Sequence, residues 1–386
     1  MNKKILACLA ISIAALQSTD SDAQSSVTLY GLVDNGIDFV NNSAGKQLLA
    51  MRDGTSTGIY GSRWGLIGHE DLGGGLETIF RLESGFNLPS GTAAQGGREF
   101  GRQAYIGLAS SRLGTVTFGR QYDSVVDFMQ FASTTSELGT FAAHGTDVDN
   151  LVNSFRIDNA VKYTSPTVSG FRLGALMNFS GTNAANAPHT IPIWSVGADY
   201  SVAGAHVAAS YLYANRPAQV FTTGDGHFIA NTTGAAIGAS GPWSYIGNPD
   251  HMSIIAAGGT YNFGNITLGG IYTRSLFAQA NGTSSDVSFD NYDVSVRYQL
   301  NPAWRFIGGY LFTVGHIDYL GQTLKYHRFI LGSRYALSKR TEVYGLVSFQ
   351  QAAGDAHYAD LYQGALASMS TTNRQIGGRI GIVHRF

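Results

Sequence analysis

Apolar and polar residues alternate along several short segments of this chain, and this period of two constrains the fold more than any other feature. From Tyr292 to Leu300 every second residue is apolar, and the residues between them are Asp, Ser, Arg and Gln. Because successive side chains of a strand point to opposite faces, the segment is predicted to be an amphipathic β-strand. Its apolar face carries Tyr292 and Tyr298 near its ends, as expected where a strand meets two lipid–water interfaces.

The same alternation recurs in three further segments, 76–83, 171–179 and 329–337, and the polar face of each carries an arginine. An arginine within a strand needs water or an acidic partner. The polar lumen of a membrane barrel supplies both. The pattern therefore predicts strands that face lipid on one side and a hydrated interior on the other.

Composition supports a barrel over other membrane or soluble folds. The chain has 49 glycines in 386 residues, 12% aromatic residues and only 13% charged residues. After the first 23 residues no apolar run approaches the length of about 18 residues that a membrane-spanning helix needs. The formal net charge of −1 gives no indication of nucleic acid as a partner.

The first 23 residues have the features of a secretory signal peptide: Lys3 and Lys4, an apolar stretch over 5–16, and small residues up to Ala23. We predict cleavage after Ala23 and a mature barrel domain over 24–386. Cys8 loosely resembles a lipoprotein processing site, but very few apolar residues precede it. If Cys8 is removed with the signal peptide, the mature chain has no cysteine and no disulfide.

Clusters of turn-forming residues divide the chain into strand-sized pieces. Seven sites are short, and about eight longer polar segments alternate with them, including 41–60, 123–155 and 216–250. Short turns on one side and long loops on the other are typical of outer-membrane barrels. The count predicts an all-β, antiparallel transmembrane barrel of about 16 strands, with fourteen or eighteen left open.

Several motifs resemble the Gram-negative general porins, most closely the trimeric porins of β-proteobacteria, and together they extend over the whole mature chain. The motifs are VTLYG at 27–31, GSRWGLIG at 61–68, EDLGGGL at 70–76, LESGF at 82–86, LGTVTFGRQ at 113–121 and NAVKYTSP at 159–166. This resemblance implies an outer-membrane channel for passive diffusion of ions and small hydrophilic solutes.

In that family the third extracellular loop, here about 123–155, folds into the barrel and its acidic residues face arginines on the opposite wall. The resemblance implies a basic cluster of Arg63, Arg120 and Arg156. Glu137 is the first candidate for the opposing carboxylate, with Asp123 and Asp127 as further candidates, although each acid could instead be a solvated loop residue. Such opposed charges would create a transverse field across a narrow hydrated gap.

The chain ends in a strand-like pattern whose last residue is Phe386, which the resemblance makes an assembly signal. It further implies a homotrimer in the outer membrane, in contact with the lipid bilayer and lipopolysaccharide, and assembly by the outer-membrane barrel machinery. No cofactor and no metal ion are expected.

Two other functions remain open. One is a solute-specific channel of the same fold. The other is a barrel enzyme, although none of the 10 histidines lies in an evident catalytic motif. A secreted adhesin is less compatible, because the chain shows no internal repeats beyond strand alternation. The sequence does not decide between anion and cation selectivity.

Overall fold

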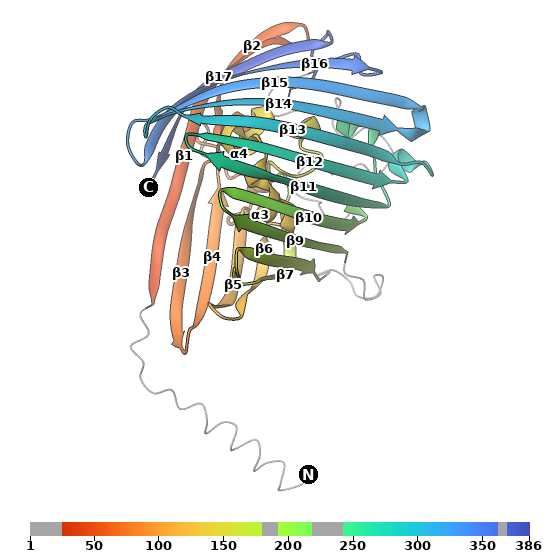
Figure 1. Ribbon diagram of the computed structural model, residues 1–386. Coiled ribbons are helices and arrows are strands. Elements are labelled where there is room, and N and C mark those ends of the chain that lie inside the picture. The colour runs from red at the N-terminus through yellow and green to blue at the C-terminus, as the bar shows by residue number, and fades with distance from the viewer. Residues whose placement is uncertain (1–24, 180–191, 218–241, 362–368) are drawn as a thin grey trace.

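A computed structural model describes residues 25–179, 192–217, 242–361 and 369–386 of the chain. The predicted signal peptide, residues 1–23, and most of the 216–250 segment lie outside the described residues. Antiparallel strands dominate the structure and form one sheet (Figure 1).

The strands are of two lengths. Those in the first half of the chain are mostly short, and those from β11 onward have 12 to 15 residues. They are β1 (Ser26–Ser43), β2 (Lys46–Asp53), β3 (Arg63–Gly73), β4 (Leu76–Gly85), β5 (Gln103–Ser110), β6 (Gly114–Gln121), β7 (Ile157–Thr164), β8 (Phe171–Asn178), β9 (Ile193–Val202), β10 (Ala205–Asn215), β11 (His251–Phe263), β12 (Ile266–Ala278), β13 (Val287–Gln299), β14 (Trp304–Ile317), β15 (Gln322–Ala336), β16 (Thr341–Gly354) and β17 (Arg374–Arg385).

The sheet closes on itself because β1 pairs with β17, from Leu32 opposite Arg385 to Val40 opposite Gly377. On its other edge β1 pairs first with β3, through residues 26–32, and then with β2, through residues 35–43. Strands β2 and β3 therefore share one position in the barrel. The 17 segments make a closed antiparallel barrel of 16 strands, which confirms the predicted architecture.

Each of the seven short turn sites predicted from the sequence separates two consecutive strands, from the β3–β4 turn to the β15–β16 turn. Alternation is confirmed as well. On β13 the side chains of Tyr292, Val294 and Val296 are exposed, whereas Asp293 and Ser295 between them are buried. The polar faces thus point to the interior and the apolar faces point outward.

The prediction of a single long loop over 41–60 is wrong in part, because residues 46–53 form β2. Ala44 and Gly45 both have positive φ, at 51° and 84°, and make a two-residue hairpin between β1 and β2. Such turns suit the twist of paired strands. Leu49 and Met51 continue the exposed apolar face of the barrel, a short alternation that the surrounding polar residues obscured.

The helices are short, and most of those in the first half of the chain lie between β6 and β7. They are α2 (Gly54–Thr57), α3 (Ser124–Met129), α4 (Thr135–Leu138) and the 3-10 turns η1 (Gln95–Gly97), η2 (Gln130–Ala132), η3 (Gly139–Ala142), η4 (His144–Thr146), η5 (Pro242–Tyr245), η6 (Ala280–Gly282) and η7 (Asp318–Leu320). Within the part of the chain described, no helix is long and apolar enough to cross a membrane.

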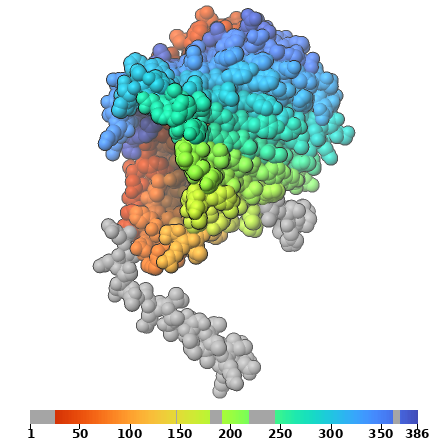
Figure 2. Space-filling view, viewed as in Figure 1, coloured from red at the N-terminus to blue at the C-terminus, as the bar shows by residue number. Residues whose placement is uncertain are grey.

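The molecule is hollowed on the face shown in Figure 2, between the orange N-terminal strands and the green and cyan strands. The segment 122–156, which connects β6 to β7 and contains α3 and α4, is almost wholly buried. Its hydrophobic side chains Phe128 and Met129 pack with the inward-facing Leu212 and Ile254 of β10 and β11. This segment determines the geometry of the candidate site.

Candidate functional site

A cavity of about 730 Å³ lies between strands β3 to β5 and the segment 122–156. Its charged lining consists of four arginines and two carboxylates. These residues are Arg63 on β3, Arg81 and Glu83 on β4, Arg102 just before β5, and Asp127 and Arg156 from the connecting segment. The lining thus carries a formal charge of 4 − 2 = +2.

Glu83 organises the strand side of the cavity. Its carboxylate accepts a hydrogen bond from Arg102 Nε at 2.7 Å and one from the Tyr30 hydroxyl at 2.7 Å, and it lies 3.7 Å from Arg63 Nε. On the loop side, Asp127 pairs with Lys162 Nζ at 2.6 Å. Both carboxylates of the lining are therefore engaged with cations, which leaves the cavity basic.

Three of the residues predicted for the constriction line this cavity: Arg63, Arg156 and Asp127. Arg156 lies over the ring of Tyr122, with 5.7 Å between the guanidinium carbon and the ring centroid. A guanidinium over an aromatic face is held by cation–π attraction. The structure thus brings together part of the predicted basic cluster and one of its candidate acids.

Arg120 and Asp123 are placed differently. Arg120 donates to Asp158 Oδ1 at 2.5 Å and to the Gly101 carbonyl at 2.8 Å, and it is not part of the cavity lining. Asp123 caps α3 by accepting from the backbone N–H groups of Val125 and Val126. Burial raises the pKa of Asp123 to about 6. The geometry gives this acid a structural role at a helix N-terminus.

Glu137, the first candidate for the opposing carboxylate, is paired with arginines other than those expected. It accepts from Arg334 Nη1 of β15 at 2.9 Å and from Arg305 Nη1 of β14 at 3.2 Å, and it lies 3.9 Å from Arg297 of β13. Charge-assisted pairs of this kind are strong when they are shielded from water. Glu137 therefore attaches α4 to the wall formed by β13, β14 and β15.

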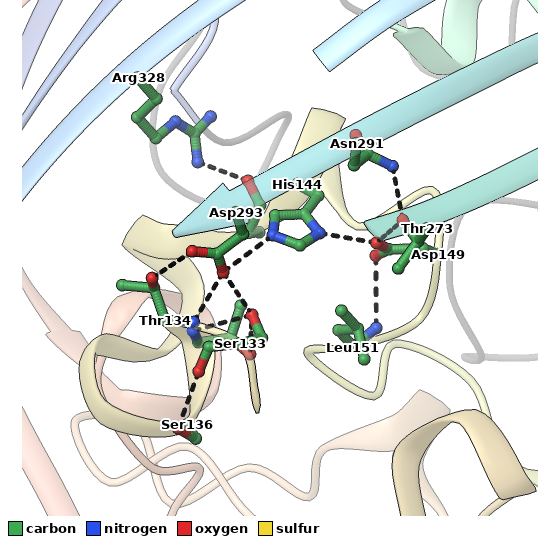
Figure 3. Close-up of polar contacts among 12 residues, drawn as sticks. Ser133, Thr134, Ser136, His144, Asp149, Leu151, Thr273, Asn291, Asp293 and Arg328 are labelled. Carbon is green, nitrogen blue, oxygen red and sulfur yellow. Dashed lines mark hydrogen bonds and ion pairs between the residues drawn. The ribbon is translucent and has the colours of Figure 1, made fainter. Parts of the chain in front are cut away.

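A second attachment involves Ser133 and Thr134, which precede Glu137 in the chain, and is centred on Asp293 of β13 (Figure 3). Its carboxylate accepts from the Thr134 backbone N–H at 2.7 Å, the Thr134 hydroxyl at 2.5 Å and the Ser133 hydroxyl at 3.0 Å. His144 joins the group, with Nε2 at 3.1 Å from Asp293 and Nδ1 at 2.7 Å from Asp149. All of these side chains are buried.

His144 is a cation in this setting. Both ring nitrogens face carboxylates, and only the imidazolium has an N–H on each nitrogen. Burial by itself would lower the pKa of His144, but Asp149 and Asp293 outweigh it and raise the pKa to about 10. Asp149 is held in turn by the Thr273 hydroxyl of β12 at 2.6 Å. The imidazolium thus links the segment 122–156 to two strands through buried charge.

Arg328 of β15 completes this wall by donating to backbone carbonyls of the same segment, Phe141 at 3.2 Å and Ala143 at 2.6 Å. Carbonyls in short 3-10 turns are not all satisfied within the turn. The inward face of β12 to β15 therefore binds the middle of the segment, from Ser133 to Asp149, whereas β3 to β5 face it across the cavity.

Several of these groups are not marked by any sequence motif. Arg81, Glu83 and Arg334 were visible as polar residues on alternating strands, and that position was the signal for an inward-facing charge. Arg102 stands outside any clear strand pattern, and nothing local marks it. The Glu137 and Asp293 partners lie about 160 to 200 residues away along the chain.

Phe386 lies where the barrel closes. Its backbone N–H donates to the Gly31 carbonyl at 3.0 Å, and its carbonyl accepts from the Gly31 N–H at 3.1 Å. Its side chain is exposed on the outer surface. In the described ranges of the chain, no three His, Cys, Asp or Glu side chains are grouped as around a metal ion.

Comparison with known proteins agrees with this architecture. The family model described as Gram-negative porin matches residues 6–355. An outer membrane porin protein of Bordetella pertussis is 31% identical over 375 residues, which cover 88% of this chain and 93% of the relative.

Among solved structures, an anion-selective porin from Comamonas acidovorans superposes with a TM-score of 0.72 at 24% identity, covering 94% of this chain and 100% of that one. OmpT of Vibrio cholerae, in a trimer form, gives a TM-score of 0.64 at 16% identity and covers 94% and 99%. These likenesses support the fold. With the family match, they establish that the chain belongs to the Gram-negative porin family and is an outer-membrane channel for passive diffusion.

Proposed function

We propose that the channel passes small hydrophilic solutes with a preference for anions, and that the cavity between β3 to β5 and the segment 122–156 is its narrowest part. The observation that carries this proposal is the charge of the lining, four arginines against two carboxylates. In a narrow gap the effective dielectric is lower than in bulk water, so fixed charges act strongly on a passing ion.

The attachment of the segment 122–156 supports this location. Glu137, His144 and Arg328 bind it to the inward face of β13 to β15. A segment held on one wall narrows the lumen in front of the other wall. The arginines Arg63, Arg81 and Arg156 then meet the solute, and their guanidinium groups favour carboxylates and phosphates.

Ion selectivity in planar bilayers tests the proposal. In a tenfold KCl gradient we expect a reversal potential of the sign set by chloride permeation. The double variant Arg63→Gln, Arg156→Gln should shift the reversal potential toward the equilibrium potential of potassium. A wild-type channel that favours potassium, or a double variant with unchanged reversal potential, would remove this cavity from the selectivity mechanism.

We further infer that the first 23 residues direct export of the chain. The barrel assembly machinery then inserts it through the strand that ends at Phe386. The inserted chains assemble as a homotrimer. The outward face of β1, β2 and β5 supports the trimer, because it is mostly aliphatic, with Phe39 as its exposed ring, and lacks the ring pairs found on β9 to β15. Its exposed residues include Val27, Leu29, Ile37, Leu49, Met51, Ile106 and Leu108. Mass measurement of the detergent-solubilised protein tests this, and a monomeric mass would exclude it.

No reaction is part of this proposal, since solutes pass unchanged. Assays of the purified protein with phospholipid and peptide substrates test that point. Hydrolysis that copurifies with the folded barrel would require a different function.

A further inference from the structure

Residues 54–62, which we call the inward bulge, interrupt one strand position of the barrel wall. Strand β1 pairs with β2 as far as Asp53 and with β3 from Arg63 onward, so the residues between them leave the sheet. They turn toward the lumen, where Ile59 joins the same hydrophobic cluster as Leu138 and most of the inward bulge lines the cavity described above. Irregular backbone is tolerated in a membrane barrel where it lines a water-filled space.

A buried arginine of β17 anchors the inward bulge. Arg379 Nη1 donates to the Thr57 hydroxyl at 2.7 Å and to Asp38 Oδ1 at 2.8 Å. Its Nη2 donates at 2.9 Å to the carbonyl of Arg52, two residues before the bulge begins. The side chain of Arg379 is fully buried. Because a guanidinium presents its donors in a rigid fork, it can hold these acceptors in one fixed arrangement.

Asp34 of β1 supplies a second anchor. Its carboxylate accepts from the Tyr60 backbone N–H at 2.9 Å, and its own backbone N–H donates to the Ser62 hydroxyl at 3.0 Å. Gly54 and Gly58 lie so close to Asp34 that a Cβ at either position would overlap its carboxyl group. Such a close approach of the backbone requires glycine. The inward bulge is therefore fixed from both β1 and β17.

The inward bulge also contacts the segment 122–156. The Thr140 backbone N–H donates to the Gly58 carbonyl at 3.3 Å. Arg334 of β15, which already binds α4, donates from Nη2 to the Tyr60 hydroxyl at 2.9 Å, and its guanidinium carbon lies 5.3 Å from the centroid of the Tyr60 ring. The same guanidinium therefore holds both inward elements, and they are joined beside the cavity.

The inward bulge contains no charged residue, although Asp53 precedes it and Arg63 follows it. It therefore contributes bulk to the lining of the cavity, whereas the arginines contribute charge. Tyr60 is its largest side chain, and this side chain is partly exposed and lines the cavity.

We propose that the inward bulge is a second constriction element, which limits the size of the solutes that pass. In this proposal the Tyr60 ring determines the width of the passage, and Arg379 is the positioning residue that keeps the inward bulge in the lumen. The proposal rests on the proposed location of the narrowest part of the channel at this cavity. Removing the ring should widen the passage without changing its charge.

Removal and chemical replacement of the Tyr60 ring test the first part. The mature chain predicted from the sequence has no cysteine, so Tyr60→Cys introduces a single thiol. We expect a higher single-channel conductance and the entry of larger sugars into proteoliposomes. Labelling with benzyl methanethiosulfonate attaches a new ring at this position and should lower both quantities toward the wild-type values.

The matched control is Tyr298→Cys, because Tyr298 is 41% exposed on the outer face of β13. Neither the substitution nor its labelling should change conductance or sugar entry. Wild-type conductance and sugar entry in Tyr60→Cys, or no decrease in either quantity after labelling, would overturn the proposal.

Arg379→Gln in the Tyr60→Cys background tests the positioning role. The thiol should still be labelled, as measured by mass, but the conductance should stay high because the new ring is no longer held in the lumen. If this variant fails to fold, Thr57→Val replaces it, since it removes only the hydroxyl of the inward bulge from the network. Full restoration of the wild-type conductance by labelling would exclude Arg379 as the positioning residue.

The width of the passage is separable from the proposed anion preference. Tyr60 is uncharged, so Tyr60→Cys should keep the reversal potential of the wild type before and after labelling with the uncharged benzyl group. A wild-type channel without anion preference would refute the proposed selectivity, whereas the conductance and sugar measurements would still test the inward bulge.

Discussion

The two walls of the barrel that face the segment 122–156 both carry arginines, but these arginines have different surroundings. On β13 to β15, Arg305 and Arg334 bind Glu137 directly. On β3 and β4, Arg63 and Arg81 line the open cavity. The guanidinium groups of β13 to β15 hold the segment through Glu137, although Arg305 also lines a second, smaller cavity, whereas those of β3 and β4 have no ion pair with the segment among the described contacts. The role of an inward arginine therefore depends on which wall the segment contacts.

The largest effect should follow from breaking the attachment wall. Asp293→Ala removes the acceptor of three hydrogen bonds and leaves His144 with one of its two carboxylates. Breaking a buried charged pair costs about 3–5 kcal/mol. We expect a lower denaturation temperature and frequent current fluctuations in single-channel records.

The exposed Glu70 at the far end of β3 provides the control for that experiment, because Glu70→Ala also removes one carboxylate. It should leave both the denaturation temperature and the current noise unchanged. A quiet, fully stable Asp293→Ala channel would show that this attachment does not hold the segment.

The next largest effect should come from the cavity wall. Arg63→Gln lowers the charge of the lining from +2 to +1 while the segment stays attached. Selectivity should move toward cations, as measured by reversal potential, without added current noise. If Arg63→Gln lowered the denaturation temperature as much as Asp293→Ala does, the two walls would not differ in how they hold the segment.

High pH should loosen the attachment wall selectively. A free imidazole has a pKa of about 6.5, and the two carboxylates raise the pKa of His144 to about 10. The contribution of the His144 imidazolium to the free energy of unfolding is thus fully present below about pH 6.5. It is lost as the pH rises through about 10. Current noise should increase above that pH in the wild type. His144→Gln channels should show no such transition.

Arg120→Gln should have the smallest effect on selectivity. Arg120 is bound to Asp158 and the Gly101 carbonyl outside the cavity lining. Reversal potential should change far less than with Arg63→Gln. An equal shift for the two variants would place Arg120 at the constriction, as its position in the sequence first indicated.

Local pattern predicted most of the strands well. The alternation from Tyr292 to Leu300 matches the second half of β13 except for its last residue, and the segments 76–83 and 171–179 match β4 and β8 closely. Turn residues located the short connections because glycine and asparagine allow backbone conformations that other residues avoid. The hairpin at Ala44 and Gly45 has no clear sequence pattern, because β2 is only 8 residues long and polar at both ends.

Sequence motifs point to some members of the candidate site but not to their partners. Of the residues predicted for the constriction, Arg63, Arg156 and Asp127 line one cavity, whereas Glu137 binds β13 to β15 and Asp123 caps a helix. Motif positions locate a residue along the chain, but they do not tell which distant strand it faces. Arg334, the nearest partner of Glu137, is 197 residues away.

The sequence by itself determined the barrel, its approximate number of strands and the side of each strand that faces water, because a period of two and turn chemistry are local properties of the chain. Tertiary structure alone decided which arginines remain in the lumen. That choice depends on closure of the sheet, which brings β13 to β15 opposite β3 to β5 and lets buried Asp293 and His144 hold the segment between them. Charge pairing across a closed barrel has no local signature.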